Sequence, residues 1–478
     1  MTGIDLGFLN YQQARRTHWN RIARKMDSWS GWSQGYYQRL KEIYRFWVSP
    51  GQSILEVGCG QGNLLAALAP SRGVGIDFSP EMISRAVQLH PRLEWREADV
   101  HNLPDLQGTF DVMILSDLID DLWDVQKAFE QLRRLCHPRT RLILNTYSRV
   151  WELPLFIAEK IGVAKPRLAQ NWLTVEDISG ILALSGFEVI RSSQDILWPF
   201  NTPVLSSLCN KLLVKLWPFR LLAMTNFILA RPFPQRVKHQ PLVSVIVPTR
   251  NESGNIGRIF DETPQLGAGT ELVFVEGHSH DDTYDAIERE MAARPSFNAQ
   301  LHRQTGEGKG DAVRLGFAHA KGDVLMILDA DLTVSPQDLP RFYEALVSGQ
   351  GEFINGVRLV YPMEQQAMRF FNFLGNKFFS LAFSWLLGQS VKDTLCGTKV
   401  MFKKDYELIA ANRTYFGNFD PFGDYDLIFG AARLGMKLVD LPIRYRARTY
   451  GETNIQRWHH GWLLLRMVVF AARRIKFI

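Results

Sequence analysis

Short apolar segments alternate with longer stretches of helical character along both halves of the chain. The first half contains the candidate strands ILEV, GVGID, LEWREADV, FDVMILS and RLILNTY, and the second half contains VSVIVP, ELVFVE, AQLHR and DVLMILD. Strands that alternate with helices build mainly parallel sheets. The pattern therefore predicts an α/β fold with two doubly wound domains.

The segment RPFPQRVKHQP, residues 231–241, separates the two halves. Its three prolines and four basic or histidine residues are typical of an exposed linker. We expect a first domain at residues 1–230, which begins with a segment ahead of the first strand and ends in apolar helices. We expect a second domain at residues 242–478, which ends in an amphipathic helix.

Three stretches mix apolar residues with basic residues, namely 196–230, 370–387 and 462–478. Each is either a core helix or a helix that lies on a membrane surface, with its basic residues among the lipid head groups. A membrane-spanning helix needs about 18 consecutive apolar residues with few or no charges. We find no such run and expect no spanning helix.

Charge and cysteine content limit the partners and the location. The net charge of +6 is mild, and the chain has neither zinc-finger spacing nor a Lys/Arg run of the nucleic-acid type. We therefore expect no nucleic acid partner. The first residues lack the apolar core of a signal peptide, and the four cysteines have neither metal-site nor redox-motif spacing. We expect a cytoplasmic protein, peripheral on the cytoplasmic face of a membrane.

A glycine-rich turn follows the first strand of the first half. ILEVGCGQGN places Gly58 and Gly60 directly after the strand, with Glu56 just before the turn. Glycine suits a sharp turn that a ligand approaches closely. The next two strands end at Asp77 and Asp99. A carboxylate at Asp77 can accept both ribose hydroxyls of an adenosine, and one at Asp99 can accept from the adenine amino group.

These elements, in this order, resemble a class I S-adenosylmethionine methyltransferase over about residues 18–195. The resemblance implies a Rossmann-like fold. It assigns S-adenosylmethionine to Glu56, Gly58, Gly60, Asp77 and Asp99. The alternatives are a dinucleotide-binding domain and a binding module without turnover.

The substrate side of the first half has weaker candidates. His101, Asp117 and Asp120 either face the methyl acceptor or are solvated surface groups. An aromatic group ahead of the first strand either forms a lid or packs on the sheet; it consists of Trp32, Tyr36 and Tyr37.

The second half begins with a strand and the sequence PTRNE, which contains Pro248 and Glu252. The next strand ends in acid at Glu276, and Asp281 lies five residues later. Lys309 follows in the glycine-rich sequence TGEGKG. We expect these residues to bind a nucleotide, with Glu252 as an acceptor for the base and Glu276 as an acceptor for the base or ribose.

A pair of aspartates ends the apolar strand DVLMILD. Asp329 and Asp331 stand one residue apart, so both carboxylates can reach one ion. The departure of a diphosphate builds negative charge, which Mg²⁺ or Mn²⁺ can neutralise, and such hard ions prefer oxygen ligands. We predict a catalytic metal site at these two residues.

The motifs of the second half resemble family 2 glycosyltransferases, from about residue 242 to 460. The resemblance implies a GT-A fold, a nucleotide-sugar donor and inversion at the anomeric carbon. The chain departs from the family at two positions: Glu276 replaces the usual Asp, and Asp282 replaces a typical Gly. In the subgroup of dolichyl- and polyprenyl-phosphate glycosyltransferases, a Gln that can join the metal shell is frequent where this chain has Thr333.

Two further segments resemble dolichyl- and polyprenyl-phosphate glycosyltransferases, namely DTLCGTKVMFKK at 393–404 and RTYGETNI at 448–455. That subgroup uses a lipid phosphate as acceptor. The basic residues Lys399, Arg446 and Arg448 either grip phosphates or are solvated.

Asp424, in contrast, favours a sugar hydroxyl as the acceptor over a lipid phosphate. It stands where many family members carry the base that deprotonates a sugar hydroxyl. A lipid phosphate is already ionised and needs no base.

The sequence thus predicts a bifunctional enzyme. One half transfers a sugar from a nucleotide sugar to a polyprenyl phosphate or a related lipid-linked or glycan acceptor. The other transfers a methyl group from S-adenosylmethionine in the same pathway. The alternative is a glycosyltransferase that acts on a sugar hydroxyl in surface polysaccharide assembly, with a non-catalytic binding module as its first half.

Overall fold

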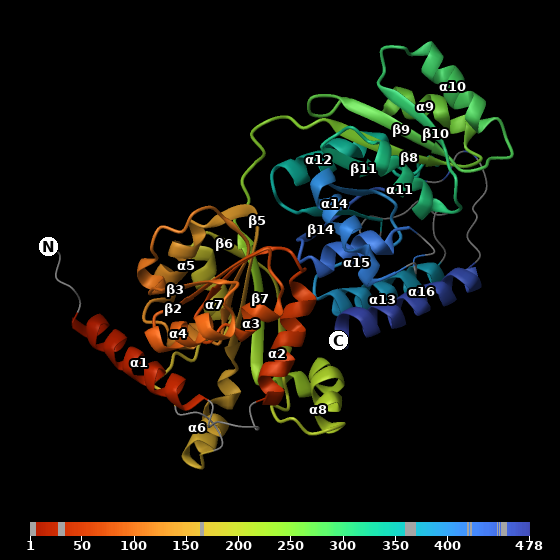
Figure 1. Ribbon diagram of the computed structural model, residues 1–478. Coiled ribbons are helices and arrows are strands. Elements are labelled where there is room, and N and C mark those ends of the chain that lie inside the picture. Colours follow the sequence, from red (N-terminus) through yellow and green to blue (C-terminus); the bar gives the residue numbers. More distant parts are fainter. Residues whose placement is uncertain are drawn as a thin grey trace. The chain divides into compact units, whose positions relative to one another are not determined.

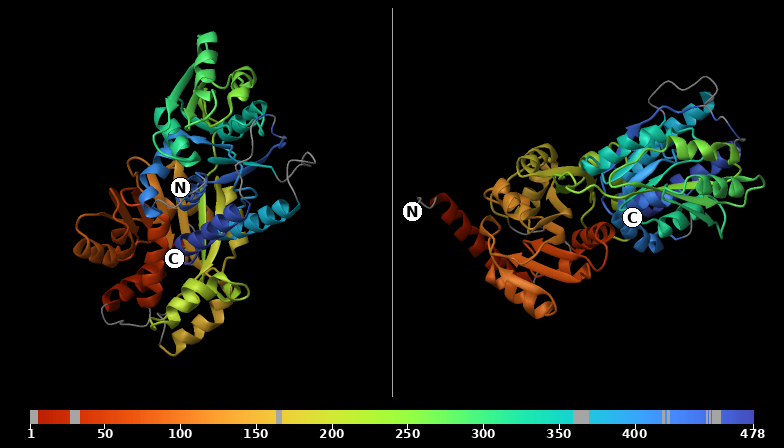
Figure 2. Two further views of the ribbon diagram at one scale, coloured as in Figure 1. Left: turned by 90° about the vertical axis from the view of Figure 1, so that its right-hand side faces the viewer. Right: turned by 90° about the horizontal axis from the view of Figure 1, so that it is seen from above.

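The computed structural model describes residues 6–26, 34–162, 167–358, 370–417, 420, 423–446, 448, 450 and 457–478. The chain divides into two compact units, Met1–Phe233 together with Phe477–Ile478, and Pro234–Lys476. Helices cover both faces of the sheet in each unit (Figures 1 and 2).

The sheet of the first unit has seven strands in the order β3-β2-β1-β4-β5-β7-β6. Strands β1 to β5 run parallel, and β7 is antiparallel to both of its neighbours. The order reverses around β1, whose carboxyl end leads into the glycine-rich turn. The strands are β1 Ser53–Val57, β2 Arg72–Asp77, β3 Glu94–Glu97, β4 Phe110–Ser116, β5 Cys136–Tyr147, β6 Phe187–Asp195 and β7 Thr225–Pro232.

Strand β7 corrects one expectation. We expected helices up to residue 230, but Thr225–Pro232 is a strand in the interior of the sheet. Phe227 and Leu229 pack into one hydrophobic core, and Ile228 and Ala230 pack into the core on the other face. A short apolar run that is buried on both faces is typical of such a strand. The strand also takes the first two residues of the expected linker.

Helices pack on both faces of this sheet. Residues of α5 and α7 join the core on one face, and residues of α2 and α3 join the core on the other. Helix α1 packs against α4. The helices are α1 Leu6–Lys25, α2 Gln34–Trp47, α3 Asn63–Ala67, α4 Pro80–Leu89, α5 Val125–Arg133, α6 Glu152–Lys160, α7 Val175–Leu184 and α8 Leu205–Ser207.

The second unit also has a seven-stranded sheet, in the order β10-β9-β8-β11-β13-β12-β14. Strands β10, β9, β8 and β11 are parallel, whereas β13 lies between β11 and β12 and is antiparallel to both. The strands are β8 Val243–Thr249, β9 Thr270–Glu276, β10 Ala299–Arg303, β11 Val324–Ile327, β12 Phe353–Val357, β13 Lys399–Phe402 and β14 Leu438–Pro442.

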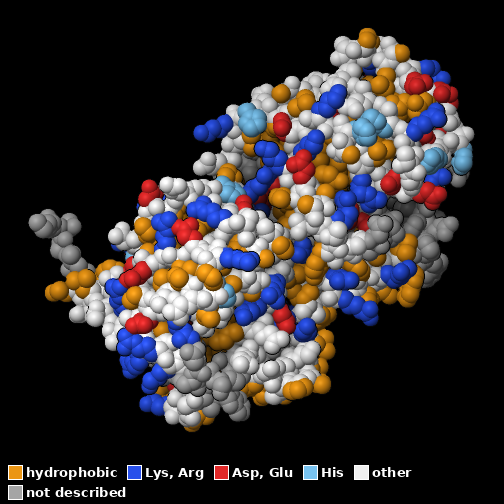
Figure 3. All heavy atoms as spheres, viewed as in Figure 1, with side chains coloured by type: hydrophobic (Ala, Val, Ile, Leu, Met, Phe, Trp, Pro, Cys, Tyr) orange, Lys and Arg blue, Asp and Glu red, His pale blue; other side chains and the backbone are white. Residues whose placement is uncertain are grey.

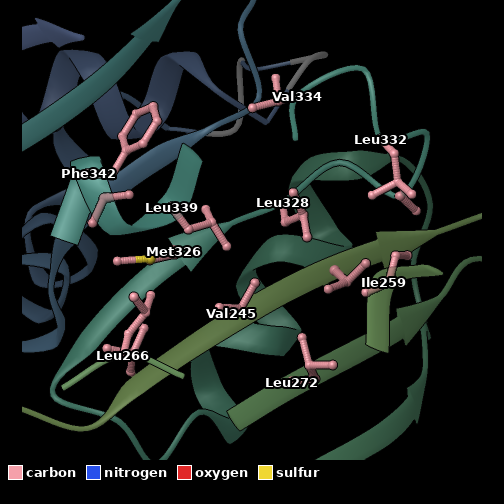
Figure 4. Packing of buried hydrophobic residues seen from close by; sticks show 14 of the residues in the cluster. Val245, Ile259, Leu266, Leu272, Met326, Leu328, Leu332, Val334, Leu339 and Phe342 are labelled. Atoms are coloured by element: carbon pink, nitrogen blue, oxygen red, sulfur yellow. The ribbon is translucent and has the colours of Figure 1, made fainter. Parts of the chain in front are cut away.

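A fully buried core fixes the strands that carry the second site. Val245, Leu272 and Met326, from β8, β9 and β11, pack with Ile259 and Phe342 (Figure 4). The helices are α9 Ile256–Glu262, α10 Thr283–Ala293, α11 Lys309–His319, α12 Leu339–Val347, α13 Phe370–Leu387, α14 Lys403–Ala411, α15 Tyr425–Arg433 and α16 Arg457–Ala471.

The predicted fold class is confirmed, because both units are α/β with a mainly parallel sheet between helices. Among the described helices, none combines the length and the apolar character needed to cross a membrane.

Candidate functional sites

The carboxyl ends of β1, β2 and β3 open onto a cavity of about 710 Å³ in the first unit. The residues that the glycine-rich turn and the strand ends predict all line this cavity, namely Glu56, Gly58, Gly60, Asp77 and Asp99. The residues of these sequence motifs therefore line one cavity, which has the volume of a small-molecule binding site.

Asp77 is held directly by the glycine-rich turn. Its Oδ2 accepts a hydrogen bond of 2.9 Å from the Gly60 amide, and its Oδ1 accepts one of 2.9 Å from the Ser79 amide. Gly58 and Gly60 have φ values of 72° and 52°, and Leu118 fills the space that a Cβ on Gly58 would need. Burial raises the pKa of Asp77 to about 6.

Glu56 forms another part of the wall. Its Oε2 accepts a 3.0 Å hydrogen bond from the Leu65 amide of α3. Burial raises its pKa to about 8, so the neutral acid is favoured at pH 7. Glu56 therefore offers the cavity a carboxylic acid rather than a negative charge.

Asp99 is fixed by three donors. The amide and the Nδ1 of His101 donate to Oδ1, over 2.9 and 2.6 Å, and Gln12 donates to Oδ2. Burial acts against ionisation of Asp99, but the bonds from His101 and Gln12 hold its pKa below the usual value. His101 Nε2 accepts from the Asp124 amide at 3.1 Å, so both ring nitrogens of His101 have partners.

The two acidic candidates for the acceptor side differ. Asp117 lines the cavity and accepts hydrogen bonds from Tyr36 and Asn145, over 2.6 and 2.5 Å. Asp120 is only 1% exposed and accepts from Thr146 and from the Tyr147 amide. Asp120 is therefore a buried structural carboxylate, which neither of our interpretations anticipated.

Helix α1 supplies cavity residues that the sequence did not indicate. Tyr11, Gln12, Arg15 and Trp19 line the cavity. Arg15 donates to the backbone carbonyl groups of Asp121 and Ala169, and thereby attaches the helix to the loop after β4. No motif marks these residues, because their roles depend on how the helix packs.

The described residues of the aromatic group ahead of β1, Tyr36 and Tyr37, have different positions. Tyr37 lines the cavity, as a lid residue would. Tyr36 is buried and packs against Tyr147, with its centroid 6.0 Å away. Trp32 lies outside the described residues.

In the second unit, two neighbouring loops carry the predicted nucleotide residues. Pro248 stands near the end of β8, and Glu252 lies in the loop that follows. The Glu252 amide donates to Thr283, whose hydroxyl donates to Asp281. Glu276 ends β9 and accepts from the Ser279 amide. Burial raises the pKa of Glu252 to about 7.

The two predicted metal ligands are each paired with a cation. Asp329 Oδ1 lies 2.6 Å from Lys309 Nζ, and Asp331 Oδ2 lies 2.7 Å from Arg448 Nη2. Thr333 donates from its amide and hydroxyl to Asp331 Oδ1. In the part of the chain that is described, no three His, Cys, Asp or Glu side chains form a group that could hold a metal ion.

Lys399 does not lie where a phosphate ligand is expected. Its side chain is fully buried on β13, 3.3 Å from Asp424 Oδ1, and it donates to the Cys396 carbonyl. Asp424 is itself only 4% exposed. The structure therefore separates Lys399 from solvent and pairs it with the carboxylate that we considered as a base.

The other two basic candidates follow β14. The Arg446 side chain is exposed, and its amide donates to the Thr333 carbonyl at 3.0 Å. Arg448 lies 3.6 Å from Glu252 as well as 2.7 Å from Asp331. Most of the segment 448–455 lies outside the described residues.

Comparison with known proteins identifies a family in each half. Residues 54–139 match the family model described as a methyltransferase domain. Residues 244–407 match the family model described as glycosyl transferase family 2.

Two curated relatives of the second half are mannosyltransferases by name. The undecaprenyl-phosphate mannosyltransferase of Micrococcus luteus is 29% identical over 229 residues, which are 45% of this chain and 87% of that protein. The dolichol-phosphate mannosyltransferase of Pyrococcus furiosus is 28% identical over 221 residues, which are 45% of this chain and 59% of that protein.

The first half is similar to the 2-phytyl-1,4-naphtoquinone methyltransferase of Trichormus variabilis. The two are 28% identical over 148 residues, which are 28% of this chain and 65% of that protein. The chain thus spans less than two thirds of this relative and of the Pyrococcus protein. Both resemblances that the motifs predict are confirmed, and the chain combines a methyltransferase domain with a family 2 glycosyltransferase domain.

Proposed function

We propose that the second half transfers a sugar from a nucleotide sugar to a polyprenyl phosphate, with inversion at the anomeric carbon. The observation that carries the proposal is the convergence of Glu252, Asp331 and Arg448, from three separate segments, at the carboxyl edge of one sheet. Ligands of open α/β sheets bind at that edge.

Different residues would bind different parts of the nucleotide sugar. Pro248, Glu252, Glu276 and Asp281 would bind the nucleoside, and Lys309 the diphosphate. Asp329 and Asp331 would hold Mg²⁺ or Mn²⁺, which neutralises charge on the departing diphosphate. Such ions usually take one or two carboxylates plus water and substrate phosphates. Two aspartates therefore fit the ion, with the donor phosphates and water as its further oxygen ligands.

The state of Asp424 supports a phosphate acceptor. The carboxylate is buried against Lys399 and would have to break this ion pair to take a proton from an acceptor. A phosphate is ionised at pH 7 and needs no base. The two mannosyltransferase relatives are also named for lipid phosphates. We propose Arg446 as a ligand of the acceptor phosphate and Arg448, which lies beside Glu252 and Asp331, as a cation that the donor and acceptor phosphates share. We no longer assign a phosphate to Lys399.

A surface on the second unit supports contact with a membrane. Helices α13 and α16 pack together, and residues 370–387 and 457–478 contain no Asp or Glu. Apolar and basic side chains lie next to each other over this pair (Figure 3). The exposed apolar side chains are Phe378, Leu381, Trp385, Trp462, Leu465 and Val469. Apolar residues with basic neighbours suit an anionic bilayer surface.

For the first half, we propose methyl transfer from S-adenosylmethionine to a compound of the same pathway. The observation that carries this proposal is the single cavity on which Glu56, Gly58, Gly60, Asp77 and Asp99 converge. Methyl transfer depends mainly on orientation when the acceptor is already nucleophilic. Asp117, which lines the same cavity, would face the acceptor.

A donor screen tests the proposal. The purified chain would be incubated with UDP-, GDP- and dTDP-sugars and Mn²⁺, with and without polyprenyl phosphate, and the lipid fraction analysed by mass spectrometry. We expect one donor to yield a glycosylated lipid phosphate only when polyprenyl phosphate is present. Transfer to a polysaccharide but not to the lipid phosphate would favour the alternative acceptor.

A further inference from the structure

Asp329 and Asp331 each form an ion pair with a basic side chain from a distant segment of the chain. Lys309, which begins helix α11, lies 2.6 Å from Asp329, and Arg448, which follows strand β14, lies 2.7 Å from Asp331. The oxygen atoms that would bind a metal are therefore neutralised by side chains of the protein itself.

Glycine residues lie close to the Lys309–Asp329 pair and leave space for its side chains. A Cβ on Gly397 would lie 2.0 Å from Asp329 Oδ2 and 2.3 Å from Lys309 Nζ, so a larger residue here would displace the two paired side chains. Gly310 and Gly423 also touch, since a Cβ on Gly310 would lie 2.7 Å from the Gly423 Cα. The second approach packs the start of α11 against the backbone just before α15, while Lys309 at the start of α11 reaches Asp329.

The second pair connects the metal position with the nucleotide loop. The Arg448 guanidinium lies between Asp331 and Glu252, 3.6 Å from the latter. Asp331 Oδ1 is occupied by the amide and the hydroxyl of Thr333, over 3.1 and 2.8 Å. Both oxygens of Asp331 thus have donors before any ion arrives.

We propose that Lys309 and Arg448 take the place of the metal on Asp329 and Asp331, and that they move to phosphate oxygens when metal and nucleotide bind together. This inference rests on the proposed sugar transfer. A cation on each carboxylate competes with a metal that arrives alone. A diphosphate offers the displaced cations new anionic partners, so nucleotide and metal favour each other's binding. Such coupling is reciprocal by thermodynamic necessity.

Titration with Mn²⁺ alone measures the competition between the metal and the two basic side chains for Asp329 and Asp331, without sugar transfer. Mn²⁺ would be titrated by calorimetry into the full chain with no nucleotide, with UDP and with GDP. For the wild-type chain we expect Mn²⁺ to bind roughly tenfold or more tightly with one of the nucleotides. For Arg448→Met and Lys309→Met we expect Mn²⁺ alone to bind roughly tenfold more tightly than to wild type, because a competing charged hydrogen bond is gone.

The same substitutions should weaken binding of the nucleotide in the presence of Mn²⁺, since the phosphates lose a cation. A purely structural defect would not strengthen one ligand while weakening the other. The matched controls are Lys321→Met and Arg341→Met, which remove exposed cations elsewhere in this unit and should leave both affinities unchanged. Because Arg448 is 28% exposed, its variant tests the idea even if Lys309→Met does not fold.

The two failures are distinguishable. Unchanged or weaker binding of Mn²⁺ alone to folded Arg448→Met would overturn the competition, whatever the nucleotide does. Absence of any Mn²⁺-dependent binding of UDP or GDP to the wild-type chain would instead count against the proposed function. In that case the Mn²⁺ titrations without nucleotide would still decide whether the cations compete.

Discussion

His101 donates to Asp99 twice, from its amide over 2.9 Å and from its Nδ1 over 2.6 Å. The other ring nitrogen accepts from the Asp124 amide, so both ring nitrogens have partners and the ring holds Asp99 in place.

We expect His101→Ala to weaken S-adenosylmethionine binding roughly tenfold or more, because Asp99 loses a charge-assisted hydrogen bond worth about 1.5–3 kcal/mol. Calorimetry would measure the affinity. His137→Ala is the matched control, since His137 also pairs with an aspartate, Asp111, at 3.1 Å, but neither residue is among those that line the cavity. An equal loss in both variants would contradict a local role for His101.

Replacement of Asp77 by Ala should weaken S-adenosylmethionine binding by about 1.5–3 kcal/mol, as expected when hydrogen bonds to a charged group are lost. Because burial raises the pKa of Asp77 to about 6, the affinity of the wild-type chain should also fall as the pH drops through that value. Asp105→Ala, at an exposed position, serves as control. Affinity that is unchanged in Asp77→Ala would remove Asp77 from the site.

Glu56 gives the first unit an unusual dependence on pH. Burial raises its pKa to about 8 in the folded chain, above the 4.5 of a glutamate in water, so between these values the folded state binds more protons than the unfolded state. The free energy of unfolding should therefore fall as the pH rises through this window. Glu56→Gln should flatten that fall and stabilise the unit by about 4 kcal/mol at pH 8. Thermal melts of both chains at pH 5 and pH 8 would test this; parallel pH dependences would refute it.

Asp331→Asn should reduce sugar transfer by roughly a hundredfold or more, since the metal and its charge neutralisation are lost. Binding of S-adenosylmethionine should be unaffected, which calorimetry on the same preparation would show. Asp285→Asn, on the exposed face of α10, should transfer sugar normally. Transfer by Asp331→Asn that also resists EDTA would exclude the metal mechanism.

The substitution Asp424→Asn distinguishes two roles of Asp424, that of a catalytic base and that of an ion-pair partner of buried Lys399. If the acceptor is a phosphate, transfer per folded molecule should fall by less than about tenfold, while the chain loses about 3 kcal/mol of stability because Lys399 remains buried without its ion pair. The double substitution Lys399→Met and Asp424→Asn should recover most of that stability. A large loss of transfer with normal stability would restore Asp424 as the base.

The turn after β1 and the acids at the strand ends were predictable, because a glycine-rich turn and a strand end are local features of the sequence. The Asp329–Asp331 pair was predictable for the same reason. The partners of these residues were not. Lys399 looked like a free cation until β13 placed it beside Asp424, and Arg15 of α1 reaches a loop more than a hundred positions away along the chain. Such contacts follow from packing, which no short sequence window encodes.

Strand β13 has a consequence for how the second unit is made. It pairs with β11 on one side and with β12 on the other, although it follows both in the chain. During synthesis, β11 therefore keeps an unpaired edge until residues 399–402 leave the ribosome. Exposed strand edges attract other chains, and pairing over long sequence separations is slow. The nascent second unit is thus open to aggregation after the Asp329 loop has appeared and before the segment with Gly397 has packed beside it.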